Sequence, residues 1–155
     1  MSRPSWDKTF MDTAKIFAKR SACVQWKVGV VIAKNKRILA TGYNGPPKGI
    51  VHCLEVGCHK IDNKGRKLPS GSGKCYGAHA EVNSITNAAC QGTTIQGATF
   101  YCTIMPCLDC AKHIINAEAK EIVFLNDYES QEKELTLELL RKAGVSVRKF
   151  SLTRR

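Results

Sequence analysis

Two short motifs carry residue types that bind metal ions and move protons. The first is His79-Ala80-Glu81, and the second, later in the chain, is Pro106-Cys107-Leu108-Asp109-Cys110. A neutral imidazole and two thiolates, from His79, Cys107 and Cys110, are three ligands for a tetrahedral zinc ion, and the fourth position stays open, as catalytic zinc sites require. Glu81 then has a carboxylate that is free of the metal. This combination predicts hydrolysis by a zinc-activated water, with Glu81 as the group that transfers protons.

Both motifs stand where the sequence predicts the start of a helix. Residues 79–91 have a helical composition and are followed by Gly92, a common helix stop. In the second helix, which we expect to run to about Ala117, Cys107 and Cys110 are three residues apart and share one face, with Pro106 in the first turn. The helix dipole favours the thiolate form there. We therefore expect the zinc site at the N-termini of two helices.

The rest of the chain predicts an α/β fold in a single domain, residues 1–155. Strands joined through helices are mostly parallel, whereas two strands joined by a short turn form an antiparallel hairpin. The order α-β-β-α-β-α-β-α-β predicts a three-layer α/β/α sandwich with a mixed five-stranded sheet. The other expected elements are a helix from Ser5 to about Arg20, strands at 27–33 and 37–41 around Lys34-Asn35-Lys36, strands at 98–104, 121–125 and 145–150, and a helix capped by Ser130, with Leu135, Leu139 and Leu140 inward, that ends at Gly144.

A second group of cysteines lies in and near residues 50–78, which show little periodicity and which we interpret as a cysteine-rich insertion. Long irregular loops in compact domains are usually functional or held in place by other bonds. Four thiolates would form a closed, structural zinc site. The candidate ligands are Cys23, Cys53, Cys58 and Cys75, with His59 as a substitute for Cys58. The alternative is that these are free thiols in a reducing compartment, and we expect Cys90 and Cys102 to be small core residues.

Composition limits the class of protein. The first 20 residues are interrupted by charges and lack the apolar core of a signal peptide, and no later run is long enough to span a bilayer, so we expect a cytoplasmic protein. The formal net charge is +11. Such a charge suits nucleic-acid binding, but the basic residues are scattered and no aromatic and basic stripe is present for stacking bases. A basic surface that attracts a phosphorylated small molecule explains the same charge.

The segment from Gly42 to Gly49 (GYNGPPKG) completes the set of motifs. Its glycines and prolines predict an irregular loop whose backbone can approach a ligand. Together, these residues resemble the deoxycytidylate (dCMP) deaminases, in the bacterial and phage branch of the zinc-dependent cytidine deaminase superfamily. The likeness runs from about Trp6 to Phe150. It includes Val28-Gly29, Gly42-Tyr43-Asn44-Gly45 with Pro47 and Gly49, the two zinc motifs with Asn83 and Ala111-Lys112, and the cysteines that match Cys23, Cys53, Cys58 and Cys75.

The resemblance implies hydrolytic deamination of dCMP to dUMP with release of ammonia, supplying dTMP synthesis. Hydroxide would attack C4 of the cytosine, and Glu81 would protonate N3 before ammonia leaves. The resemblance also implies that Asn44 contacts the deoxyribose, that Ala80 contacts the base through its backbone, and that Tyr128 and Lys27 lie near the phosphate. It further implies a homo-oligomer, commonly a hexamer, activated by dCTP with Mg²⁺ and inhibited by dTTP near the loop that contains Gly42, Tyr43, Gly45, Pro47 and Gly49.

Two other functions fit parts of the sequence. A tRNA or polynucleotide deaminase would share the zinc chemistry and would bind RNA or DNA with an affinity that falls steeply with salt. A non-catalytic zinc module would use both metal sites for stability and its positive charge to bind nucleic acid, and it would not depend on Glu81. We expect a small-molecule nucleotide as the partner, with no membrane and no stable nucleic-acid partner.

Overall fold

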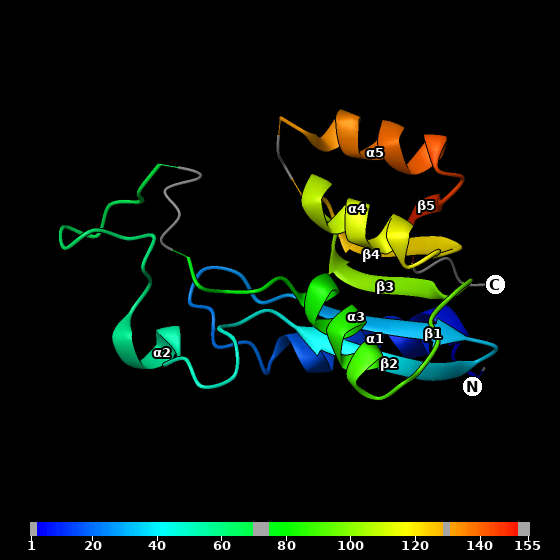
Figure 1. Ribbon diagram of the computed structural model, residues 1–155, viewed down its shortest axis with the longest axis horizontal. Helices are drawn as coiled ribbons and strands as arrows, with labels where there is room; N and C mark the ends of the chain where they lie inside the picture. Colours follow the sequence, from blue (N-terminus) through cyan, green and yellow to red (C-terminus); the bar gives the residue numbers. More distant parts are fainter. Residues whose placement is uncertain (1–2, 70–74, 129–130, 152–155) are drawn as a thin grey trace.

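Five strands form one mixed sheet in the order β2-β1-β3-β4-β5 (Figure 1). The computed structural model describes residues 3–69, 75–128 and 131–151. Strand β1 is antiparallel to both β2 and β3, whereas β3, β4 and β5 are parallel to one another. The strands are β1 (Gly29–Lys34), β2 (Arg37–Tyr43), β3 (Thr99–Ile104), β4 (Glu121–Asn126) and β5 (Ser146–Lys149).

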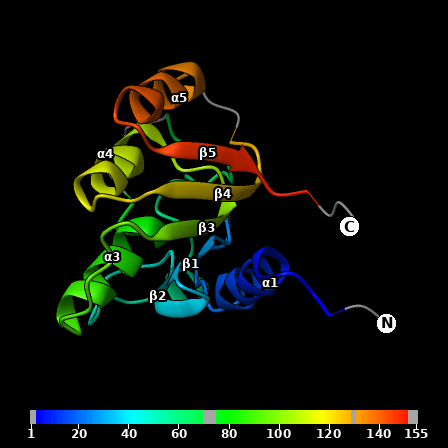
Figure 2. The same cartoon turned by 90° about the vertical axis from the view of Figure 1, so that its right-hand side faces the viewer.

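Helices cover both faces of this sheet, which confirms the predicted three-layer α/β/α sandwich (Figure 2). Helix α1 (Trp6–Ala18) lies on one face, where Met11 packs with Val31 and Val123. Helices α3 (Ala80–Cys90), α4 (Leu108–Asn116) and α5 (Lys133–Lys142) lie on the other face. The larger part of the core is on that face and includes Phe100 and Ile114. The order of these elements agrees with the prediction.

Local sequence signals explain several of the boundaries. The Ser5 hydroxyl accepts a hydrogen bond from the Lys8 amide at 3.2 Å, so it caps α1 as predicted. Asn35 and Lys36 have φ angles of 52° and 61°, and this left-handed pair forms the two-residue turn between β1 and β2. Gly144, with a φ of 75°, follows the end of α5. The predicted cap at Ser130 lies outside the described residues.

Some predictions about individual positions were wrong. Gly42 and Tyr43 belong to β2, and only the residues after them leave the sheet. Cys90 is exposed at the end of α3, whereas Cys102 is buried as expected. Leu135 is 52% exposed, although the same helix buries Leu140 completely. In each case the rotation of a helix or the packing of a strand, which local sequence does not specify, decided the outcome.

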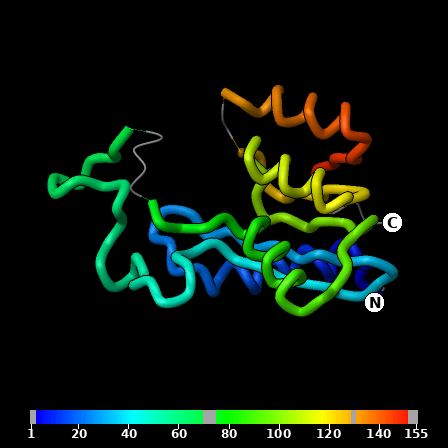
Figure 3. The backbone as a smooth tube through the Cα atoms, in the orientation of Figure 1, coloured from blue at the N-terminus to red at the C-terminus, as the bar shows by residue number. Residues whose placement is uncertain are grey.

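The cysteine-rich insertion stands beyond the end of the sheet at which α3 begins (Figure 3). It contains one short helix, α2 (Cys53–Val56), where we expected no regular structure. The chain returns to the sandwich at an isolated bridge, in which the backbone amides of Gly45 and Ala78 each donate to the other's carbonyl oxygen. His79 follows Ala78 directly, so the bridge helps to fix the position of His79. No described helix combines the length and the apolar character needed to cross a membrane.

Candidate active site and metal centre

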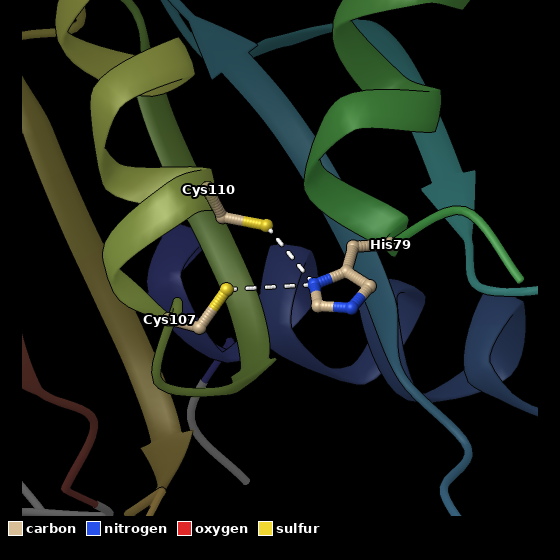
Figure 4. Close-up of side chains that lie close together, drawn as sticks. All are labelled: His79, Cys107 and Cys110. Carbon is tan, nitrogen blue, oxygen red and sulfur yellow. Dashed lines mark hydrogen bonds between the residues drawn. The ribbon is translucent and has the colours of Figure 1, made fainter. Parts of the chain in front are cut away.

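His79, Cys107 and Cys110 come together at the facing N-termini of α3 and α4 (Figure 4). His79 is the N-cap of α3 and Cys107 is the N-cap of α4, while Cys110 lies in the first turn of α4. The Nδ1 atom of His79 lies 3.5 Å from Cys107 Sγ and 3.3 Å from Cys110 Sγ. Pro106 therefore precedes the N-cap and lies outside the first turn, where it was predicted. The predicted trio is otherwise brought together as expected.

The distances fit a tetrahedral zinc ion. Zn–S bonds of about 2.3 Å and Zn–N bonds of about 2.0–2.1 Å, at a tetrahedral angle, place nitrogen and sulfur ligands about 3.6 Å apart. The ligand atoms of the three residues all lie within 4.8 Å of one another. Cys110 is buried, Cys107 is partly buried and His79 is exposed, so the cluster is open on the side of the histidine. This donor set could hold a zinc ion through its three side chains, and its open side would leave room for solvent or substrate.

The electrostatics of the trio favour a thiolate at Cys107. A hydrogen bond from the Cys110 thiol, helped by the bond to His79, lowers the pKa of Cys107 to about 4. The same bond raises the pKa of Cys110, the buried partner. The hydrogen bond to Cys107 also raises the pKa of His79, while burial and the charge of Lys60 act in the opposite direction. Cys107 is therefore the first sulfur ready to bind a cation, because a thiolate is the metal-binding form.

Glu81 is the buried acid of the site. Glu81 is only 5% exposed and lies in the first turn of α3, two positions after His79. Burial raises the pKa of its carboxyl group above the ordinary value, and the side chain is hydrogen-bonded to Cys110. A carboxyl group with a raised pKa can accept a proton and return it near neutral pH. Glu81 thus lies beside His79 and Cys110, the candidate metal ligands, where a group that transfers protons is needed.

A pocket of about 210 Å³ opens beside Glu81 and is also lined by His79 and Cys107. Asn44, Ala80 and Tyr128, the predicted substrate contacts, all line it. Lys27 does not line it, although its neighbours Trp26 and Val28 do. The Asn44 side chain accepts a hydrogen bond from the Val28 amide and donates one to the Trp26 carbonyl oxygen, both at 2.8 Å. These bonds fix the orientation of Asn44 on the pocket wall.

The four cysteines of the second group gather at another part of the same pocket. Cys23, Cys53, Cys58 and Cys75 all line it, as does His59. Burial raises the pKa of the Cys53 thiol, and the charges of the other three cysteines raise it further. Among the described residues, only the trio of His79, Cys107 and Cys110 has at least three potential ligand atoms within 4.8 Å of one another. The four sulfurs are thus neighbours that are spaced more widely than the trio.

Sequence reasoning predicted no role for several residues that build the site. The side-chain amides of Asn83 and Asn87 donate to the carbonyl oxygens of Tyr43 and Thr41, both at 2.8 Å, and so tie α3 to β2. Their spacing of four residues on one helix face was the available signal. Lys60, in the insertion, also lines the pocket, and no local pattern distinguishes it from the other lysines.

Comparisons with known proteins agree with this geometry. Residues 4–126 match the family described as the cytidine and deoxycytidylate deaminase zinc-binding region. The deoxycytidylate deaminase of Saccharomyces cerevisiae is 38% identical over 99% of this chain and 47% of its own length. That of Enterobacteria phage T4 is 33% identical over 90% of this chain and 86% of its own length.

A solved structure is similar over almost the whole chain. The dCMP deaminase of cyanophage S-TIM5, in complex with dCMP and dUMP, is 31% identical, with a TM-score of 0.78 over 97% of this chain and 100% of the cyanophage chain. The chain spans about half the length of the Saccharomyces cerevisiae relative and of the deoxycytidylate deaminase of Schizosaccharomyces pombe. The sequence match, the fold and the trio of His79, Cys107 and Cys110 together show that the chain belongs to the family of the cytidine and deoxycytidylate deaminase zinc-binding region.

Proposed function

We propose that this protein deaminates dCMP to dUMP by hydrolysis and releases ammonia. The observation that carries the proposal is the buried Glu81 beside the trio of His79, Cys107 and Cys110 in a small pocket. The similarity to a phage dCMP deaminase that was solved with dCMP and dUMP supports dCMP as the substrate. The product would supply dTMP synthesis, in pyrimidine metabolism.

The residues of the site divide this chemistry among them. When bound, zinc lowers the pKa of a water ligand to about 7 and supplies a nucleophile at neutral pH. Glu81 would take a proton from the attacking water on its carboxylate and deliver it to N3 of the cytosine while the water oxygen bonds to C4. It would then move the proton of the new hydroxyl group to the amino nitrogen, so that the C4–N bond breaks and ammonia leaves. Asn44 holds the deoxyribose, the backbone of Ala80 contacts the base, and Tyr128 faces the phosphate end. Because Lys27 is absent from the pocket lining, its predicted place near the phosphate has less support.

A substrate panel tests this proposal. The purified protein would be assayed for ammonia release with dCMP, deoxycytidine, CMP and single-stranded DNA, and dCMP should have the highest kcat/KM. Faster turnover of any other substrate would overturn the choice of dCMP. Tight RNA or DNA binding that weakens steeply with salt would favour a polynucleotide or tRNA deaminase. A protein that binds zinc but deaminates none of the four would be the non-catalytic module.

We further infer a second, structural zinc bound by Cys23, Cys53, Cys58 and Cys75. Support comes from the position of all four cysteines in the lining of one pocket, and from the charges of Cys23, Cys58 and Cys75 that act on the Cys53 thiol, because such charges act between neighbouring side chains. Metal analysis should give about two zinc ions per chain, and about one for Cys53→Ser. His59 is the alternative ligand to Cys58, so Cys58→Ser and His59→Ala identify which of the two binds. A ratio near one in the unaltered protein would remove the second site.

We propose the remaining properties from the family resemblance. They are a single deaminase domain over residues 1–155, a cytoplasmic location, and a homo-oligomer, most simply a hexamer. The segment that follows β2 supports control by nucleotides, because Gly45 and Pro46 line the pocket and an effector beside them would reach the substrate. Velocity against dCMP, with dCTP and Mg²⁺ or with dTTP, tests the control. If neither dCTP nor dTTP changes the velocity, regulation by these nucleotides is excluded. Analytical sedimentation tests the hexamer.

A further inference from the structure

Lys60 is the basic residue on the wall of the substrate pocket. Among the described residues that line this pocket, no other lysine and no arginine is present. The chain has 24 lysines and arginines in total, so among the described residues most of the positive charge lies outside the lining of this pocket. Within the described lining, Lys60 is the one lysine or arginine that an anionic group could meet. Net charge draws anions toward the protein, but a cation inside the pocket can favour the anions that are held there.

The ammonium group of Lys60 is available to a ligand. Within the described part of the chain, no carboxylate lies within ion-pair distance of it, in contrast to the lysines paired with Asp109 and Asp127. The backbone around it is held, since the Lys60 carbonyl oxygen accepts from the Leu68 amide at 2.8 Å and the Ile61 amide donates to the Cys58 carbonyl oxygen at 3.0 Å. A ligand can thus pair with Lys60 without first breaking an ion pair.

The position of Lys60 relative to the reacting groups sets the orientation of a ligand. Glu81 and Cys107 line the same pocket, and the charge of Lys60 is felt at the imidazole of His79, although Lys60 does not bind to it. The neutral ring of a substrate belongs beside Glu81, where protons are exchanged. An attached phosphate must then point away from the buried acid and toward the cation, because a carboxylate repels it and an ammonium attracts it.

We propose that Lys60, supplied by the cysteine-rich insertion, binds the 5′-phosphate of the substrate and makes the enzyme select a nucleoside monophosphate over the free nucleoside. This assignment rests on the proposed function as a dCMP deaminase. It gives the insertion a direct part in substrate recognition, in addition to any metal that it holds. It also places the phosphate contact about thirty residues along the chain from Lys27.

The variant Lys60→Gln tests the assignment, because it keeps an unbranched, polar side chain that is one atom shorter and removes the charge. We expect KM for dCMP to rise about 10- to 100-fold, the loss typical of a hydrogen bond to a charged group, with kcat little changed. Turnover of deoxycytidine, which has no phosphate, should be the same as in the unaltered protein. Lys60→Arg should recover part of the affinity, since it restores the charge with a different geometry.

Two lysines provide matched controls. Lys64→Gln removes the same charge from the same insertion, at a position outside the lining of this pocket, and should leave KM for dCMP unchanged. Lys27→Gln tests the alternative contact. A normal KM for dCMP in Lys60→Gln would overturn the proposal, and a raised KM in Lys27→Gln alone would move the phosphate to Lys27. Circular dichroism would confirm that each variant is folded.

Binding measurements separate this proposal from the proposed function. Calorimetry with dUMP and deoxyuridine reports on the phosphate contact without turnover. Weaker binding of dUMP by Lys60→Gln, with equal binding of deoxyuridine, would support the role of Lys60 even if another pyrimidine nucleotide proved to be the better substrate. Equal binding of dUMP by both proteins would overturn it. A failure of the unaltered protein to deaminate dCMP would instead reject the proposed function.

Discussion

Gly42 of β2 lies directly against Ser84 of α3. A β-carbon at Gly42 would lie 2.5 Å from the Ser84 amide nitrogen and 2.4 Å from the Ala80 carbonyl oxygen, both too close for any side chain. Glycine is therefore required for the strand and the helix to approach to this distance. Because α3 starts immediately after His79 and carries Glu81, this contact sets the positions of the proposed metal ligand and of the proposed proton carrier together.

Gly42→Ala is predicted to destabilise the fold by about 1–3 kcal/mol, since overpacking forces the backbone of α3 to move. The displaced helix should also bind zinc more weakly through His79. Gly45→Ala is the matched control, because a β-carbon at Gly45 meets no atom within 4 Å. Urea unfolding and metal analysis of both variants would check this. Equal stability and zinc content in Gly42→Ala and in the unaltered protein would show that β2 and α3 separate without cost.

The zinc-binding trio and the layers of the fold were predictable because their signals are local. Histidine and the Pro-Cys-x-x-Cys motif carry both the ligand chemistry and the start of a helix, so type and position are encoded together. The alternation of strands and helices, with one short turn at Asn35 and Lys36, then limits the sheet to a mixed topology. These features do not depend on contacts between distant residues.

Other features depend on distant contacts and were missed for that reason. Gly42 resembles a turn residue in sequence, yet its function is to admit the backbone of α3, which lies about forty residues later. The exposure of Cys90 and Leu135 depends on how each helix is rotated against the sheet. Lys60 lines the pocket only because the insertion supplies part of the pocket wall. None of these contacts and positions can be predicted from the neighbouring sequence alone.

Glu81→Gln should lower kcat by about 10²- to 10⁴-fold or more, because an amide cannot transfer the proton that general acid–base catalysis requires. The amide has almost the same shape and fills the same buried site, so the fold and the zinc content should be retained. Single-turnover assays together with metal analysis would measure both effects. Unchanged activity would remove Glu81 from the chemistry, and loss of zinc would show that its carboxylate is a metal ligand.

The carboxylate of Asp127 predicts a loss of stability in acid. Asp127 pairs with Lys133 at 2.8 Å and with Lys149, and these hydrogen bonds, that of Lys133 first, lower its pKa to about 2. A folded-state pKa below the unfolded value of about 3.9 stabilises the protein above pH 4, and this contribution disappears as the pH falls toward 2. Asp127→Asn should therefore be less stable at pH 7, and the difference should vanish near pH 2.

Chemical unfolding at several pH values would measure this difference. The unaltered protein and Asp127→Asn both lose metal in acid, so the difference between them reports on the Asp127 carboxylate alone. Glu138→Gln, which breaks an exposed pair with Lys142 within α5, is the control and should change stability by only a few tenths of a kcal/mol. A stability difference for Asp127→Asn that does not depend on pH would rule out the ion pairs as its cause.

Tyr101→Phe should lower the free energy of unfolding by about 1 kcal/mol, the net contribution of one hydrogen bond. The Tyr101 hydroxyl donates to Asp7 at 2.8 Å and so connects β3 to α1. Asp7 is also paired with Arg148 of β5 at 2.7 Å. The ring packs on Phe10, and phenylalanine keeps that contact. Because α1 covers the face of the sheet opposite to α3 and α4, kcat and KM for dCMP should not change. Thermal unfolding and steady-state kinetics would separate the two effects, and a loss of activity without a loss of stability would contradict the purely structural role of this bond.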